Sequence, residues 1–152
     1  MNWNSIKKQI YFEDGSLRDI IVPDWSVDNW RKWTELINAK YKVEFSNGQT
    51  ETISDKINFE VVKAYWEGKS DIINTATIYI DQVIIKCYFF DDKEFENDIQ
   101  PKEFVAMKDH LNLVDYMIAI SSLNKKTVLL TNENLGNSVL IEVSGQDVKY
   151  CA

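Results

Sequence analysis

The chain has 152 residues, of which 45% are hydrophobic and 27% are charged, and its formal net charge is −7. These values are typical of one globular domain over residues 1–152, long enough to bury about 68–70% of its unfolded surface. The negative charge argues against a nucleic-acid binder, which needs basic side chains, and against attachment to anionic membranes. An acidic surface is compatible with a basic protein partner, although solubility alone also explains it.

The sequence contains no signal-peptide core and no run of about 18 apolar residues, so we expect a cytoplasmic protein that does not span a membrane. Its two cysteines, Cys87 and Cys151, are too few for a disulfide framework and lack CxxC spacing. Cys87 lies in an apolar segment, which predicts a buried thiol, whereas Cys151 is expected to be exposed.

The sequence EDGSLRDI, residues 13–20, lies between two apolar-rich segments and contains an Asp-Gly pair, which is a strong hairpin signal. With a three-residue loop, Phe12 pairs with Arg18, while Tyr11 and Asp19 fall on the opposite face. Arg18 then has apolar neighbours. We expect its side chain either to reach the edge of the sheet or, if it is buried, to need a carboxylate partner.

Residues 27–39 are predicted to form an amphipathic helix that packs on the sheet, because apolar residues recur along one side of it. Ser26 is a suitable N-cap for this helix. Trp25 and Trp30 have the spacing of a hydrophobic staple, in which the residue before the cap packs against the first turns. The segment therefore predicts a helix with a defined beginning.

The pair Asn47-Gly48 predicts a type I′ hairpin between strands at residues 41–46 and 49–53, which sets Phe45 opposite Thr50. Residues 55–67 are ambiguous. Apolar residues at helical spacing and a glycine just past the end favour a helix, but alternation and β-branched residues also suit a strand. We expect the helix.

The second half of the chain predicts five strands and one long helix. The strands are expected at residues 72–80, 83–90, 127–131, 138–143 and 147–150. The run 83–90 is nearly continuous in apolar residues and should be a central strand covered on both faces. The helix begins between residues 102 and 109 and ends near residue 123. If the acidic stretch 91–101 is also a strand, its acids share one face and Phe95 lies on the other. These elements predict an α+β fold with two to three helices on a mostly antiparallel sheet, and a hairpin–helix–hairpin plan that occurs twice.

No catalytic constellation is recognisable in the sequence. His110 is the only histidine, so a multi-histidine metal site cannot be built within one chain, and we expect it to be exposed or half-buried. A catalytic pair with Cys87 is disfavoured, because an apolar strand opposes thiolate formation. There is no glycine-rich phosphate loop, and the acidic run 91–98 lacks the glycine of a calcium loop. We therefore predict no enzymatic activity, no cofactor and no metal.

Seven acidic residues are candidates for contact with a basic partner. They are Asp14, Asp19, Asp91, Asp92, Glu94, Glu96 and Asp98. The alternative role for the run 91–98 is a solvated edge that discourages aggregation between sheets. Reversal of Asp91, Asp92, Glu94 and Glu96 should slow association with a basic partner more at low salt than at high salt.

Five tryptophans suggest a second class of function, a carbohydrate or small-ligand site built on exposed indole rings. The spacing of Trp25, Trp30 and Trp33 already explains them as core residues. Trp3 and Trp66 are less constrained. A small-ligand or carbohydrate-binding domain that uses exposed tryptophans is therefore the alternative function.

Two stretches carry a family likeness. One is WNSIKKQIYFEDGSLRDIIV, followed by a helix that begins near DW; the other is FENDIQPKEF, then a helix and KKTVLLTNEN before an apolar strand. They resemble small bacterial immunity-type proteins, the cytosolic antidotes of polymorphic or contact-dependent toxins, over most of the chain. The resemblance implies a non-enzymatic inhibitor of one toxin domain, often a basic nuclease, and it transfers no binding residue. We expect a monomer or a weak homodimer.

Overall fold

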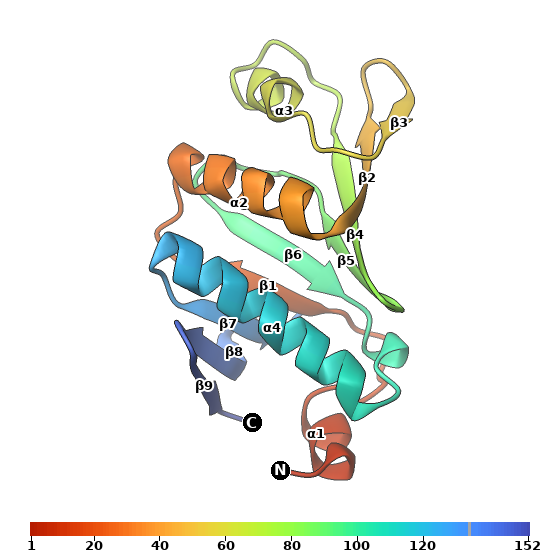
Figure 1. Ribbon diagram of the computed structural model, residues 1–152, viewed down its shortest axis with the longest axis vertical. Helices are drawn as coiled ribbons and strands as arrows, with labels where there is room; N and C mark the ends of the chain where they lie inside the picture. The colour runs from red at the N-terminus through yellow and green to blue at the C-terminus, as the bar shows by residue number, and fades with distance from the viewer. Residues whose placement is uncertain (134) are drawn as a thin grey trace.

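The computed structural model describes the backbone of residues 1–133 and 135–152, and side chains outside residues 134–137 (Figure 1). The described strands form one antiparallel sheet in the order β3-β2-β4-β5-β6-β1-β7-β8-β9. These strands are β1 (Arg18–Val22), β2 (Lys42–Asn47), β3 (Thr52–Ser54), β4 (Thr75–Ile80), β5 (Val83–Cys87), β6 (Phe95–Ile99), β7 (Val128–Asn132), β8 (Leu135–Ser144) and β9 (Asp147–Tyr150). The helices are α1 (Trp3–Gln9), α2 (Val27–Lys40), α3 (Phe59–Trp66), the 3-10 helix η1 (Pro101–Glu103) and α4 (Met107–Asn124).

Helices α2 and α4 pack against each other on one face of the sheet (Figure 1). Because the helices cover one face only, burial alternates along the strands. On β2, Val43 and Phe45 are buried, whereas Lys42 and Glu44 on the other face are exposed. No described α-helix packs on that other face, which we call the open face, although the 3-10 helix η1 lies beside β5 and β6 there. The predicted α+β fold, a mostly antiparallel sheet with helices on one side, is confirmed.

Aromatic side chains fill the space between α2 and the sheet. Trp30 lies at ring-centroid distances of 5.3 Å from Trp33, 5.8 Å from Trp25 and 5.2 Å from Phe95. All four rings are buried, and burial of each apolar side chain stabilises the fold by about 1.5–3 kcal/mol. The interpretation of the three α2-region tryptophans as core residues is confirmed, and so is the contact of the predicted staple.

Local capping explains why two predicted helices begin where they do. At the start of α2, Asn29 N donates to Ser26 Oγ (3.2 Å) and Ser26 N donates to Asn29 Oδ1 (3.1 Å), which is a reciprocal capping box. At the start of α3, Val61 N donates to the side chain of Asn58 (3.3 Å). Within the ambiguous segment 55–67, residues 59–66 form the expected helix, which begins after Asn58.

The β2–β3 hairpin is confirmed, but its predicted register is wrong. Phe45 pairs with Ser54 instead of Thr50, because the loop is longer than the two residues of a type I′ turn. The reason is local: Asn47 Oδ1 accepts the N–H groups of Gln49 (3.1 Å) and Thr50 (3.3 Å), which stabilises a wider turn.

The N-terminal hairpin predicted around residues 13–20 is wrong. Residues before the loop form α1, capped by Asn2, and β1 pairs with β6 and β7 instead. Tyr11, predicted for a polar face, is fully buried. Because α1 replaces a strand, the structure has more helices than predicted. The predicted hairpin–helix–hairpin plan is therefore found only in the second half of the chain.

Candidate interaction surface on the open face of the sheet

The structure divides the predicted acidic contacts among three places. These are a loop (Asp14), the connection from β5 to β6 (Asp91, Asp92 and Glu94) and the open face (Asp19, Glu96 and Asp98). The last group comes together through pairing of β1 with β6, two strands that lie far apart in the sequence. Glu96 and Asp98 alternate with buried residues of β6, as predicted.

A row of polar side chains crosses five neighbouring strands on the open face. The register places Thr77 opposite Lys86, Lys86 opposite Asp98, Asp98 opposite Asp19, and Asp19 opposite Thr131. We call these five residues the polar row. Directly opposed residues of paired strands have Cβ atoms roughly 4.5–5.5 Å apart, so the row is continuous.

Charge is unevenly distributed along the polar row. Asp98 and Asp19 are adjacent like charges, an arrangement that destabilises an antiparallel pair. Lys86 is the cation of the row, and its Nζ donates to Thr77 Oγ1 (3.0 Å) on the side away from Asp98. Thr131 is fully buried, and its Oγ1 has no hydrogen-bond partner among the described residues. The row thus combines three buried residues, Asp19, Thr77 and Thr131, with two half-exposed ones, Lys86 and Asp98.

The surroundings of Asp98 and Glu96 oppose ionisation of both carboxyls. Burial, with repulsion from Asp19 and Glu133, raises the pKa of Asp98 to about 6. Burial, with repulsion from Asp19, Asp98 and Glu94, also raises the pKa of Glu96. Lys86 offsets part of this repulsion at Asp98, and a further cation would relieve more of it, because an opposite charge within a few ångströms favours the ionised carboxylate.

A hollow of about 170 Å³ opens beside Asp98, between β5, β6 and η1. Its walls include Leu17, Ile84, Lys86, Tyr88, Asp98 and Glu103. We call it the β5–β6 hollow. Just outside it, the ring of Phe90 stacks on that of Tyr88 with centroids 5.5 Å apart and planes inclined by 18°, and Phe90 is 59% exposed. The site therefore combines carboxylates with an accessible aromatic surface.

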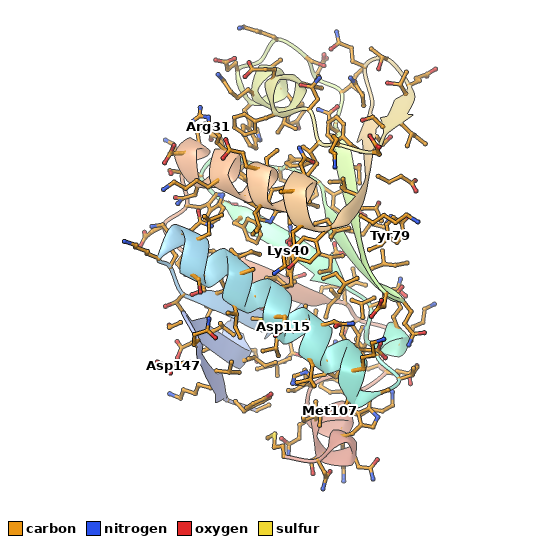
Figure 2. The ribbon with its side chains drawn as sticks, in the orientation of Figure 1. Arg31, Lys40, Tyr79, Met107, Asp115 and Asp147 are labelled. Carbon is orange, nitrogen blue, oxygen red and sulfur yellow. The ribbon has the colours of Figure 1, made fainter. Side chains whose placement is uncertain are left out.

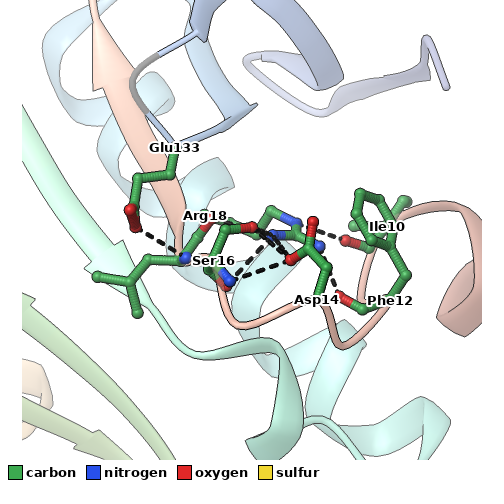
Figure 3. A network of polar contacts seen from close by, with 7 residues as sticks. Ile10, Phe12, Asp14, Ser16, Arg18 and Glu133 are labelled. Atoms are coloured by element: carbon green, nitrogen blue, oxygen red, sulfur yellow. Dashed lines mark hydrogen bonds and ion pairs between the residues drawn. The ribbon is translucent and has the colours of Figure 1, made fainter.

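Arg18 holds the loop that forms one side of this hollow (Figure 3). Its side chain is fully buried, so the expected position at the edge of the sheet is wrong. Nε donates to Ile10 O (2.8 Å), Nη2 to Phe12 O (2.7 Å) and Nη1 to Ser16 Oγ (2.8 Å). A carboxylate partner is also present, since Asp14 Oδ1 lies 3.9 Å from Nη1.

The same loop is fixed to the far side of the polar row. Leu17 N donates to Glu133 Oε2 (2.9 Å), which brings another carboxylate toward Asp98. Within the loop, Ser16 N and Ser16 Oγ both donate to Asp14 Oδ1. Asp14 therefore shapes a turn, and it belongs to the rim of the site more than to the polar row.

His110 is placed differently from the prediction, because it is fully buried and not at the surface. Its Nδ1 is 2.6 Å from Tyr11 Oη, and its Nε2 is 2.7 Å from Tyr150 Oη. Burial lowers the pKa of His110 to about 4, so the ring is neutral near pH 7. Both ring nitrogens are occupied, and the histidine joins α4 to the N-terminal loop and β9.

The remaining candidates from the sequence have mainly structural environments. Cys87 is buried, as predicted, and burial raises the pKa of its thiol, while Cys151 is exposed. Trp3 and Trp66 are half-buried against the core, and Trp66 Nε1 donates to Phe89 O (2.9 Å). Within the described residues, no three histidine, cysteine or acidic side chains are placed to hold a metal ion.

Lys86, Tyr88, Phe90 and Glu103 were not singled out in the sequence. The first three lie in the apolar run 83–90, which suggested a strand buried on both faces. The signal that could have found them is the lysine within that run, because alternation places it on the same face as Tyr88. Burial along β5 alternates accordingly, with the odd-numbered residues buried and the even-numbered ones half-exposed.

No protein-family model, curated protein or solved structure matches this chain. Among the helices that the structure describes, none has both the length and the apolar character needed to cross a bilayer. The function must therefore be argued from the geometry of the open face and from the sequence.

Proposed function

We propose that the protein is a non-enzymatic immunity protein that binds and neutralises a basic toxin domain in the cytoplasm. The observation that carries the proposal is the pair of acids on β6, where Glu96 is exposed and Asp98 half-exposed on a face that no described α-helix covers. Acidic neighbours raise the pKa of both carboxyls, and a cationic partner would offset this repulsion in the complex. The resemblance of the sequence to immunity-type proteins supports the same function.

The mechanism is occlusion. A toxin that acts on nucleic acid needs a basic surface, and an acidic protein docked on that surface blocks access to the substrate. Backbone hydrogen bonds within the sheet hold Glu96 and Asp98 on a rigid scaffold, so little conformational entropy is lost when they bind. Charge complementarity also accelerates the encounter, most strongly at low ionic strength.

Co-expression with the toxin encoded beside this gene tests the proposal. The wild-type protein should restore growth, and the double variant Glu96→Gln/Asp98→Asn should restore it less. The matched control is Asp55→Asn/Asp147→Asn, which removes two exposed acids outside the open-face row. Figure 2 labels Asp147 on β9, the edge strand two strands beyond the β7 end of the row, and Tyr79 on β4, the strand at the other end of the row. Equal cell death with and without the wild-type protein would contradict the proposed function.

The other predicted acids offer a second readout of the same proposal. Reversal of Asp91, Asp92, Glu94 and Glu96 should slow association with the purified toxin more at low salt than at high salt. If this variant associates at an unchanged rate and still neutralises the toxin, the interface does not include β6 or the connection before it.

A further inference from the structure

We infer that the β5–β6 hollow is the receptor for one arginine side chain of the partner protein, held between the Tyr88–Phe90 ring pair and the carboxylates of Asp98 and Glu103. The inference rests on the proposed function, because it assigns the contact through which a basic partner is held. It commits to a guanidinium group, whereas the proposed function requires only a basic surface.

The charge around the hollow favours a cation from outside the chain. Asp98 and Glu103 reach it from two different elements, β6 and η1. Asp19, Glu96 and Glu133 add negative charge around Asp98. Lys86 also lines the hollow, and its charge offsets part of that of Asp98 and Glu103, while Glu103 Oε1 accepts the N–H of Ile84 (3.3 Å). The acidic groups around the hollow outnumber this cation, so an excess of negative charge remains. The hollow is thus complementary to a positive group.

The aromatic pair distinguishes arginine from lysine. Phe90 is an exposed large aromatic residue, and its ring is nearly parallel to that of Tyr88, with an angle of 18° between the planes. A guanidinium is planar, stacks on such rings and donates hydrogen bonds to carboxylates in a fixed fork, whereas an ammonium is a strongly hydrated point charge. Arginine is also enriched among residues that contribute most to binding energy at protein interfaces.

Titration of the full chain with a hexa-arginine peptide, followed by amide NMR shifts, tests this inference without the toxin. We expect shifts concentrated at residues 84–90 and 98–103, and binding at least about fivefold weaker for hexa-lysine. Hexa-citrulline, which is nearly isosteric with arginine but uncharged, should not bind. Asp98→Asn and Phe90→Ala should each weaken hexa-arginine binding at least about threefold, while Asp147→Asn should change it less than twofold.

Equal binding of hexa-arginine and hexa-lysine, or equal losses for Asp98→Asn and Asp147→Asn, would overturn the inference. Thermal unfolding of each variant shows whether it is folded, and Glu103→Gln provides a second probe if Phe90→Ala is not. The two proposals fail separately. If hexa-arginine binds at the hollow but the protein does not neutralise the toxin, the proposed function is wrong. If the protein neutralises the toxin but shows no preference for arginine, the hollow is not an arginine receptor.

Discussion

Toward α2 and α4, strands β1 and β7 place Ile20 opposite Leu130, and both side chains are fully buried. One residue along the same strands, toward the open face, Asp19 stands opposite Thr131. The covered face is stabilised by apolar area removed from water, which needs no specific partner. The open face instead holds charges and hydroxyls whose energies depend on what lies next to them. Stability therefore resides mainly on the covered face, and the proposed recognition on the open one.

The largest effect is expected on the covered face. Trp30→Ala removes a buried indole that contacts Trp33 and Phe95, and leaves a cavity under α2. Truncations of this kind lower the free energy of unfolding by about 3–5 kcal/mol. Urea denaturation followed by circular dichroism measures the change, with Arg31→Ala on the exposed side of the same helix as the control. A loss below about 1 kcal/mol would mean that the covered face is not the main source of stability.

Arg18 differs from the apolar residues of the covered face, because it is a buried charge whose guanidinium donates hydrogen bonds to backbone carbonyl groups. Arg18→Met keeps most of the aliphatic stem but removes the donors to Ile10 O and Phe12 O, and we expect a loss of about 2–3 kcal/mol. The loop should also loosen, so amide exchange at residues 13–17 should accelerate more than exchange in α2. Equal acceleration in the two segments would show that the effect is global and that Arg18 does not hold the loop specifically.

Local signals predicted much of the fold on the covered face. The Ser26 cap and the apolar periodicity placed α2 correctly, and the same periodicity placed α4. The Asp-Gly pair wrongly predicted a hairpin because it lies in a turn that the hydrogen bond between Asp14 and Ser16 closes. The side chain of Arg18 donates to backbone carbonyl groups that would have accepted hydrogen bonds from a paired strand. Side-chain capture of backbone groups depends on tertiary structure, and sequence spacing does not reveal it.

The open face was less predictable because its key neighbours come from distant strands. Alternation alone placed Glu96 and Asp98 on one face of β6. The opposition of Asp98 and Asp19 follows from the pairing of β6 with β1, two segments about 80 residues apart, and no local pattern encodes that register. The aromatic pair next to them was hidden within an apolar run that suggested burial on both faces.

A smaller and opposite effect is expected from Asp98→Asn, which should raise the free energy of unfolding by about 1 kcal/mol at pH 7 after allowance for solvent screening. Burial and the charges of Asp19 and Glu133 raise the pKa of Asp98 to about 6 in the folded protein. Protonation therefore favours the folded state, fully below about pH 4, and this contribution is lost as the pH rises through about 6.

The pH dependence separates this explanation from a simple loss of surface charge. The difference between Asp98→Asn and the wild type in urea denaturation should be largest at pH 7 and should nearly vanish at pH 4. Asp147→Asn, with an exposed acid at the other side of the sheet, should differ little from the wild type at either pH. A destabilised Asp98→Asn at pH 7 would mean that the carboxylate has a stabilising partner, and the contrast between the faces would be lost.

The smallest effect compares two buried hydroxyls, one on each side of the sheet. Thr34 on α2 and Thr131 on β7 both have an Oγ1 without a partner among the described residues. Replacement of either by valine removes an unsatisfied polar group at nearly constant volume, so each change should raise the free energy of unfolding by about 0.5–1 kcal/mol. Neither change should alter neutralisation of the toxin, because both hydroxyls are buried out of reach of a partner. Weaker neutralisation by Thr131→Val alone would mean that this hydroxyl supports the shape of the open face, and would contradict the description of the two groups as equivalent.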